Sequence, residues 1–308
     1  MNFLALRWRA VRPFSFTVSV LPPVLGSLLA AMENPDMDFG WLRFFLTVLG
    51  CVVAHAGSNL IADYFDYKNQ VDREDPFGPS RILVEGTLTP AQVFRGSVAC
   101  FLAAAAIGAY FVMMTPNGTF LVWLILVGGL LGVFYTAKPF QLKYNALGDV
   151  AVFVAFGSAM TLGAYYVQAH RFSWAPVLYV LPAAFLVDAV LHSNNLRDIE
   201  ADRKAGIKTL AMVMGERRAA GMYYVLVLGA YASHAVLVAL AGMPPATLVT
   251  WFSLPLALRR IQLVRNRATV PPEQFAMIDA RTAELHSAFG VLLVVSLLVQ
   301  HCVLKARL

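Results

Sequence analysis

The sequence predicts an all-α integral membrane protein, on the basis of its composition, its long apolar runs and the placement of its basic residues. Of the 308 residues, 59% are hydrophobic and only 14% are charged, and the mean hydropathy is +0.65. A soluble domain of this length could not keep so much apolar surface away from water. We therefore expect a bundle of membrane-spanning helices.

Nine apolar runs are long enough to cross a bilayer, which requires roughly 17–25 residues per helix. They are expected at 14–32, 41–62, 91–114, 118–136, 147–168, 175–194, 220–241, 244–263 and 284–304. The eighth run is the weakest because prolines interrupt it. The first lacks a small-residue cleavage site and is expected to be a retained helix. Because the polar connections are short, residues 1–308 are expected to form a single transmembrane domain.

The basic residues explain the net charge of +6 without invoking nucleic acid. With nine spans and the amino terminus inside, nearly all of them fall at the cytoplasmic ends of helices, which is the topological signal of an inner-membrane protein. The four exceptions are Arg43, Arg171, Lys305 and Arg307. The three cysteines lie in apolar runs without metal-site or disulfide spacing.

Two acidic motifs lie at the predicted cytoplasmic ends of the second and sixth runs, in SNLIADYFDYKNQVDRED and NNLRDIEADRKAG. If the second helix continues through Asp66, then Asn59, Asp63 and Asp66 share one helical face. The second motif spaces its polar residues in steps of four, at Asn194, Asp198 and Asp202. The two sets are 135 residues apart, so the two helices are expected to present equivalent faces across a central cavity that opens to the cytoplasm.

Basic residues are interleaved with these acids. Carboxylates gathered at a membrane edge repel one another unless a cation neutralises them. A purely acidic site would suit cation transport, whereas acids mixed with bases suit a magnesium-bound polyphosphate. Magnesium usually takes only one or two carboxylates alongside phosphate oxygens and water, so the five Asp residues of the two motifs are consistent with two ions. The candidate metal ligands are Asp63, Asp66, Asp72, Asp198 and Asp202, and the candidate ligands for the diphosphate include Arg81, Lys138, Arg197 and Lys208.

For several other polar residues, the sequence is consistent with two different roles. Asn59, Asn194 and Asn195 are expected either to contact substrate or metal or to link helices through amide hydrogen bonds. Tyr135 is either an interfacial anchor or a hydrogen-bond donor to the diphosphate. At membrane depth, His55 and the pair Asp188 and His192 either orient the second substrate or link helices.

Several segments together resemble the UbiA superfamily of intramembrane prenyltransferases, with a closer likeness to its dihydroxynaphthoate-specific MenA branch. These segments are RPFSFTVSVLPPVLG, NLIADYFD, GPSR, NNLRDIEADRKAGIKTLAMVMG and TAELHSAFGVLL. The chain departs from the family at Ala62, where members often carry Asn. Both Asp72 and Asp75 follow the first motif, and the spacing favours Asp72 as its third acid.

The resemblance implies magnesium-dependent transfer of a polyprenyl group from its diphosphate to 1,4-dihydroxy-2-naphthoate, with release of diphosphate and carbon dioxide in menaquinone biosynthesis. It implies that Asp63, Asp66, Asp198 and Asp202 are the catalytic acids. The alternatives are a UbiA-type enzyme with a different acceptor and, from another class, a cation transporter. The implied partners are the polyprenyl diphosphate, the aromatic acceptor and membrane lipid. The sequence makes no prediction of prenyl chain length or oligomeric state.

Overall fold

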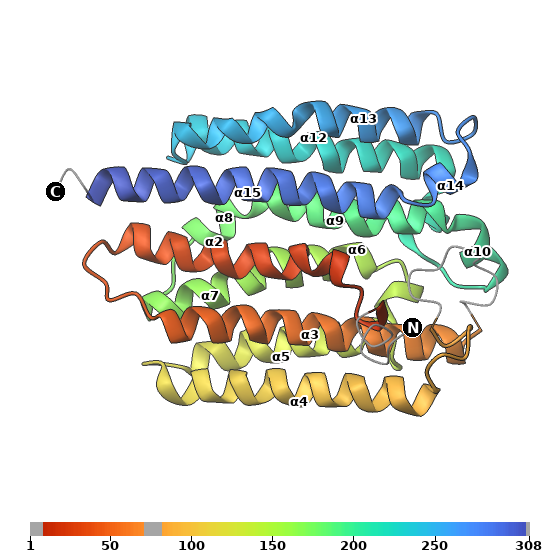
Figure 1. Cartoon of the computed structure of the whole chain (residues 1–308), viewed down its shortest axis with the longest axis horizontal. Helices are drawn as coiled ribbons and strands as arrows, with labels where there is room; N and C mark the ends of the chain where they lie inside the picture. Colours follow the sequence, from red (N-terminus) through yellow and green to blue (C-terminus); the bar gives the residue numbers. More distant parts are fainter. Residues whose placement is uncertain (1–8, 71–81, 306–308) are drawn as a thin grey trace.

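The computed structural model describes residues 9–70 and 82–305, and its regular elements are helices (Figure 1). The longer helices are α2 (Thr17–Glu33), α3 (Trp41–Lys68), α4 (Pro90–Met114), α5 (Thr119–Val133), α7 (Met160–Ala169), α9 (Leu181–Arg197), α12 (Glu216–Leu240), α13 (Leu254–Arg265) and α15 (Ile278–Lys305). The shorter ones are η1 (Pro13–Phe16), η2 (Leu142–Tyr144), α6 (Gly148–Val152), η3 (Phe153–Ala159), α8 (Ala175–Tyr179), α10 (Ile199–Lys204), α11 (Leu210–Met214), η4 (Pro245–Ser253) and α14 (Pro272–Phe275).

Within the described residues, six helical segments have the length and composition to cross a membrane. They are Pro13–Glu33, Trp41–Lys68, Pro90–Met114, Gly148–Ala169, Glu216–Leu240 and Pro272–Val303. The apolar helix Thr119–Val133 is shorter. All nine predicted runs fall on helical structure, but four of them are not single α-helices. The run 14–32 begins in η1 and continues as α2, and the run 147–168 consists of α6, the π-helical segment η3 and α7. The run 175–194 divides into α8 and α9, and the run 244–263 divides into the 3₁₀ segment η4 and α13.

Proline explains the breaks before α9 and α13, because it lacks an amide hydrogen and clashes with the preceding turn. Pro182 lies in the first turn of α9, and Pro255 lies in the first turn of α13. Each is tolerated there because the first turn of a helix has no internal partner for its amide groups. The prolines therefore start new helices instead of continuing old ones. The count of nine spans stays a prediction.

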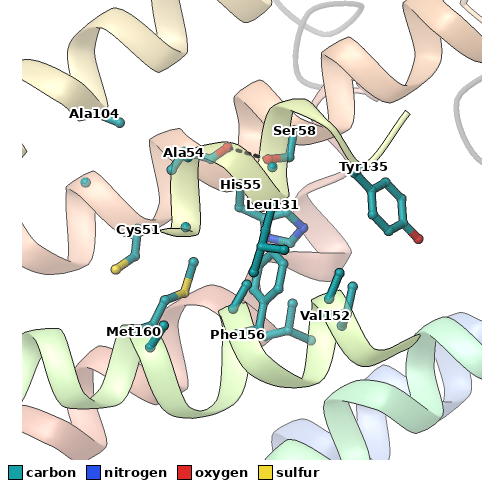
Figure 2. A pocket seen from close by; sticks show the side chains of 18 of the residues that line it. Cys51, Ala54, His55, Ser58, Ala104, Leu131, Tyr135, Val152, Phe156 and Met160 are labelled. Carbon is teal, nitrogen blue, oxygen red and sulfur yellow. Dashed lines mark hydrogen bonds between the residues drawn. The ribbon is translucent and has the colours of Figure 1, made fainter. Parts of the chain in front are cut away.

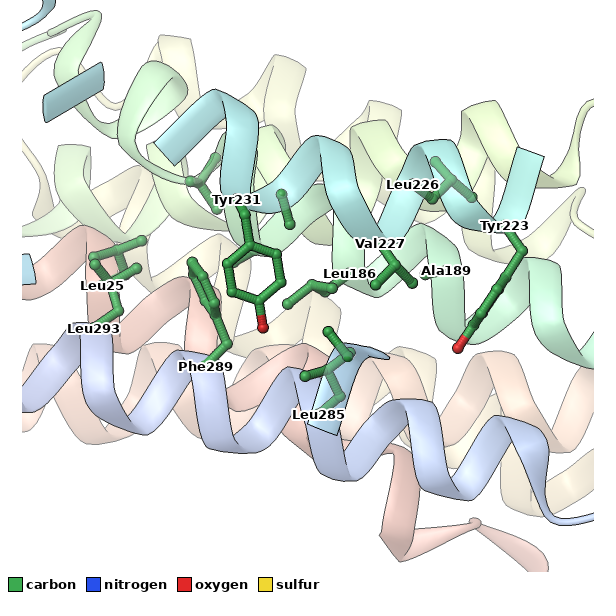
Figure 3. Close-up of a cluster of buried hydrophobic side chains, with 14 of the residues drawn as sticks. Leu25, Leu186, Ala189, Tyr223, Leu226, Val227, Tyr231, Leu285, Phe289 and Leu293 are labelled. Carbon is green, nitrogen blue, oxygen red and sulfur yellow. The ribbon is translucent and has the colours of Figure 1, made fainter. Parts of the chain in front are cut away.

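One half of the bundle has a dense apolar core between α2, α9, α12 and α15 (Figure 3). Leu25, Leu186, Leu226 and Leu285 are among its fully buried side chains. The buried tyrosine hydroxyls in this core are satisfied, since that of Tyr223 lies 2.9 Å from Thr282 Oγ1. Close packing without strain resists deformation. This half therefore forms a firm support for α9, which carries the second acidic motif.

The other half contains α3, α4, α5 and α7 and is packed less completely. α3 and α4 are in close contact, where Ser97 donates a 2.9 Å hydrogen bond to the carbonyl of Gly57. Large apolar side chains such as Trp41, Leu102 and Trp123 are exposed on the outside. Exposed apolar surface of this extent is expected to face lipid. These helices and the dense half together form the walls of an internal cavity.

Candidate active site

Both acidic motifs contribute to one cavity of about 670 Å³. The first contributes Asn59 and Asp66 from α3, and the second contributes Asn194 from α9. On α3 the lining residues run from Thr47 to Asp66, about 28 Å at 1.5 Å per residue. Most of the wall is apolar, with Leu131, Val152, Phe156 and Met160 among the side chains that line it (Figure 2). Asp63, Asp198 and Asp202 are not among the lining residues, so the expected meeting of equivalent helix faces across a central cavity stays a prediction.

The first motif is buried at one end of this cavity. α3 continues beyond the predicted run 41–62 to Lys68, which meets the condition for a shared face, so Asp63 and Asp66 lie on the last turns of one helix. Both are almost completely buried, and each contacts a cation. Asp63 pairs with the guanidinium of Arg12, and Asp66 Oδ2 lies 2.8 Å from Lys143 Nζ. A carboxylate in a low-dielectric site needs such partners because unpaired burial of a charge is costly.

The connection after α5 delivers Lys143 to Asp66. It folds back on itself, so that the amide of Lys143 donates to the carbonyl of Tyr135 at 2.8 Å. Tyr144 also reaches the first motif, donating its hydroxyl to Asp66 Oδ1 at 2.5 Å. Burial alone would lower the pKa of Lys143, but Asp66, Tyr144 and Asp202 outweigh it and raise that pKa well above its usual value. Lys143 is therefore a permanent buried cation beside the first motif.

The second motif is held by a tight turn after α10. Gly206 has a φ of +71°, which only glycine adopts readily. The amide of Ile207 then reaches back to the carbonyl of Asp202, and that of Gly206 reaches the carbonyl of Arg203, which together cap the helix. The hydroxyl of Thr209 donates to Asp202 Oδ2 at 3.0 Å. The glycine in the DRKAG segment thus fixes the acid that precedes it.

Asp202 links the two motifs electrostatically. Burial and the like charges of Asp198 and Asp66 together raise the pKa of Asp202 to about 7, although Lys143 and the hydrogen bond from Thr209 partly oppose this rise. Lys143 interacts electrostatically with both Asp66 and Asp202, so one acid from each motif is affected by the charge of the same lysine. An additional cation between the acids would remove the repulsion that raises this pKa.

The helical segment that carries the second motif is interrupted at Asp198. α9 ends at Arg197, and α10 begins at Ile199. The hydrogen bonds from Asp198 to Asn194 and from Asp202 to Asp198 still span four residues, so the expected spacing survives the break. The small departure of the Asp198 backbone from helical geometry, with ψ of 8°, accounts for the interruption.

Arg197 contacts acids of the protein in this structure. Its Nε and Nη2 donate to the two carboxylate oxygens of Asp198 at 2.6 and 2.8 Å. Its Nη1 lies 2.9 Å from Asp279 Oδ2, and Asn194 also donates to that oxygen at 3.3 Å. Paired arginine–carboxylate contacts of this kind fix geometry as well as charge. Arg197 thereby joins the second motif to the start of α15.

A second polar network lies behind the motif. His192 Nδ1 is 2.8 Å from Asp149 Oδ1, and its Nε2 is 2.9 Å from the carbonyl of Ala219. Asn195 donates to the other oxygen of Asp149 at 3.4 Å. This network ties α6 to α9 and α12, so Asn195 and His192 have a linking role here. Asp188 is buried one turn earlier on α9.

The remaining predicted residues separate by position. Tyr135 lines the cavity, whereas Lys138 and Lys208 are exposed and are not among the residues that line it. The amide of Lys208 instead donates to the carbonyl of Tyr144 at 3.2 Å, holding the two loops together. Arg81, Asp72 and Asp75 lie outside the described residues.

The sequence pattern predicts no specific site role for Arg12 or Lys143, and none of the predicted site residues is Tyr144, Asp149 or Asp279. Their common signal is a polar residue next to a span boundary. Arg12 precedes a proline-rich start, and Asp149 follows the turn LKYNALG. Such residues can be recognised as buried only when the neighbouring helix is known.

Within residues 9–70 and 82–305, no three His, Cys, Asp or Glu side chains are grouped closely enough to hold a metal ion. The acids are instead paired with individual bases. This arrangement still fits magnesium bound together with a polyphosphate, because that ion needs only one or two carboxylates when phosphate oxygens and water complete its octahedron. The buried, mutually repelling Asp66 and Asp202 supply the oxygen donors that a hard cation requires.

The fold and the cavity define an integral membrane protein that can hold a long apolar molecule with a charged end. The UbiA prenyltransferase family model matches residues 20–285. The chain belongs to this family and is a prenyltransferase.

Among curated relatives, a UbiA prenyltransferase domain-containing protein 1 homolog from Drosophila melanogaster is 31% identical over 95% of this chain and 79% of its own length. The 1,4-dihydroxy-2-naphthoate octaprenyltransferase of Bacillus subtilis is 28% identical over 96% of this chain and 92% of its own length. A solved UbiA homolog from Archaeoglobus fulgidus, bound to GPP and Mg²⁺, is 20% identical, with a TM-score of 0.63 and coverage of 94% of this chain and 99% of its own. This last likeness concerns the fold.

Proposed function

We propose that the protein transfers a polyprenyl group from polyprenyl diphosphate to 1,4-dihydroxy-2-naphthoate in a magnesium-dependent reaction, with release of diphosphate and carbon dioxide. The observation that carries this proposal is the composition of the cavity, where Asp66 and Lys143 lie at the polar end of an otherwise apolar chamber. A polyprenyl diphosphate has the same division between a charged head and an apolar tail.

The charged end would bind the diphosphate. Asp63, Asp66, Asp198 and Asp202 would hold two magnesium ions, with Asp72 as the candidate fifth acid, and the ions would neutralise the diphosphate oxygens. Lys143 and Arg12, which now pair with Asp66 and Asp63, would stabilise the charge that develops on the leaving group. Arg81, Lys138, Arg197 and Lys208 remain proposed contacts of the head group, as do Asn59, Asn194, Asn195 and Tyr135.

The apolar wall would protect the reaction. As the bond between the prenyl carbon and the diphosphate weakens, that carbon becomes cationic and would be quenched by water. Side chains such as Leu131, Val152 and Phe156 line the cavity and would exclude water from that carbon. A carbon of the electron-rich acceptor ring then attacks this prenyl carbon, and the new carbon–carbon bond forms.

The acceptor is the finer part of the proposal. The Bacillus subtilis relative supports dihydroxynaphthoate, because its name states that acceptor and the alignment covers nearly all of both chains. The second candidate is a UbiA-type reaction with a different acceptor, because the Drosophila melanogaster relative, which is slightly more identical to this chain, has a name that states no acceptor. A cation transporter is disfavoured because Arg12 and Lys143 beside the acids would repel a bare cation.

The proposed location is the inner cell membrane, with the acidic end of the cavity facing the cytoplasm. Figure 1 shows the carboxyl end of α3 at the same end of the bundle as α10 and α14. Arg203, Lys204 and Arg265 belong to this end by their positions in α10 and α13. A concentration of basic residues at one end supports a cytoplasmic assignment.

Product analysis with purified protein in lipid tests the proposed reaction. The protein would receive magnesium, a polyprenyl diphosphate and either dihydroxynaphthoate or 4-hydroxybenzoate. We expect prenylated naphthoquinol and carbon dioxide with the first acceptor and no product after Asp63→Ala or Asp198→Ala. Turnover of the benzoate alone would reassign the acceptor, and absence of both products would refute the proposed function.

A further inference from the structure

A row of polar side chains descends from the charged end of the cavity into its apolar part. On α3, Asp63, Asn59 and His55 are spaced by four residues and share one face. His55 lies two turns below Asp63, about 12 Å along the helix axis. Asn59 lines the cavity, as does Ser15 of η1. His55 also lines it, near Phe156 (Figure 2). The cavity therefore has a polar strip beside the expected position of the reacting carbon.

Among the residues that the structure describes, the hydrogen bonds around His55 leave one ring nitrogen without a donor. Ser15 Oγ donates to the carbonyl of Arg12 at 2.8 Å, and Ser19 Oγ donates to the carbonyl of Phe16 at 3.1 Å. Both serines therefore present lone pairs to the imidazole. A neutral imidazole carries a single N–H, which can satisfy only one of them.

The two contacts are unequal and indicate which nitrogen carries the hydrogen. His55 Nδ1 lies 3.1 Å from Ser19 Oγ, whereas Nε2 lies 3.4 Å from Ser15 Oγ. We assign the N–H to Nδ1 because its contact is the shorter one, and this assignment leaves Nε2 with a lone pair. Asn59 Nδ2 also points at Ser15 Oγ at 3.4 Å, which occupies that oxygen further. Nε2 is thus an acceptor in need of a hydroxyl or amide hydrogen.

Aromatic rings hold His55 in this orientation. The ring of Phe16 meets it edge-on with centroids 5.6 Å apart, and that of Phe156 meets it edge-on at 4.7 Å. Phe156 itself lines the cavity. Edge-to-face pairs and flanking hydrogen bonds fix a ring before a ligand arrives. An aromatic ligand can pack on Phe156 while its hydroxyl reaches Nε2.

We propose that Ser15, His55 and Phe156 form the binding subsite for the aromatic acceptor, with His55 Nε2 accepting a hydrogen bond from a ring hydroxyl. This inference rests on the proposed function and specifies its acceptor as a hydroxylated aromatic ring. The hydrogen bond holds that ring about one to two helical turns below Asp63, against the polar strip. The prenyl tail then occupies the apolar wall formed by residues such as Leu124 and Leu131.

Competitive inhibition tests this subsite independently of the reactivity of each ring. Inhibition constants of 2-naphthoate, 1-hydroxy-2-naphthoate and 4-hydroxy-2-naphthoate would be measured for wild type, His55→Leu and His55→Gln. We expect wild type to bind one hydroxylated analogue about tenfold more tightly than 2-naphthoate, since a buried acceptor left unpaired is costly. His55→Leu abolishes that preference without changing the KM for the prenyl diphosphate, and His55→Gln, whose amide oxygen can accept, restores part of it.

His286→Leu serves as the matched control, because His286 is buried in α15 and is not among the residues that line the cavity. It should leave the hydroxyl preference intact. An unchanged preference in His55→Leu would overturn the subsite while leaving the proposed function standing. If wild type neither prenylates an aromatic acceptor nor is inhibited by these analogues, the proposed function and the subsite both fail.

Discussion

Lys143→Met tests a site residue that the structure identifies and the sequence pattern does not. The sequence pattern favours Lys138 instead. Lys143 Nζ lies 2.8 Å from Asp66, and its field also reaches Asp202. The lysine side chain is only 18% exposed, so water replaces it poorly. Removing one well-placed charge-stabilising group from an active site costs about 10²–10³ in rate. We expect a loss of kcat in that range.

Lys138→Met is the matched comparison because the two lysines are five residues apart in the same connection. Lys138 is exposed and is not among the residues that line the cavity. Although Lys138 is also a proposed contact of the head group, water screens its exposed charge, so its replacement should cost less than that of Lys143. Both variants would be assayed for diphosphate release in lipid, and thermal unfolding in detergent would verify that each is folded. An equal or larger loss in Lys138→Met would refute the assignment of Lys143.

Three further substitutions test particular contacts. Tyr144→Phe removes the 2.5 Å hydrogen bond to Asp66, and the loss of a bond to a charged group, about 1.5–3 kcal/mol, should appear as a lower midpoint of thermal unfolding. Asp149→Ala leaves His192 and Asn195 without their shared partner, and breaking a buried pair should destabilise the fold by about 3–5 kcal/mol, measured by the same unfolding assay. His286→Leu should raise the unfolding midpoint, because neither ring nitrogen has a hydrogen-bond partner among the described residues. A lower midpoint would contradict that reading.

The sequence was sufficient to predict the helices and the acidic faces. Apolar runs and helical spacing depend on neighbours within one segment, so α3 and the positions of Asp63 and Asp66 on it could be derived directly. The breaks before α9 and α13 were harder to place, since proline in an apolar run can either kink a helix or start a new one.

Partners across the bundle could not be derived in this way. Lys138 and Lys143 have similar sequence surroundings, and only the folded-back connection after α5 shows that Lys143 reaches Asp66. The same applies to Arg12, which finds Asp63 through the packing of the amino-terminal segment on α3. Long-range pairing depends on topology, which local pattern does not contain.

Binding of a polyprenyl thiodiphosphate, a donor analogue that reacts slowly, tests most directly whether the acidic motifs form a magnesium–diphosphate site. Its affinity for the purified protein would be measured with and without magnesium, in wild type, Asp66→Asn and Asp202→Asn. Tight binding that requires magnesium and is weakened in both variants is the predicted result. Equally tight binding without magnesium, or in both variants, would contradict the assignment of these acids to the metal.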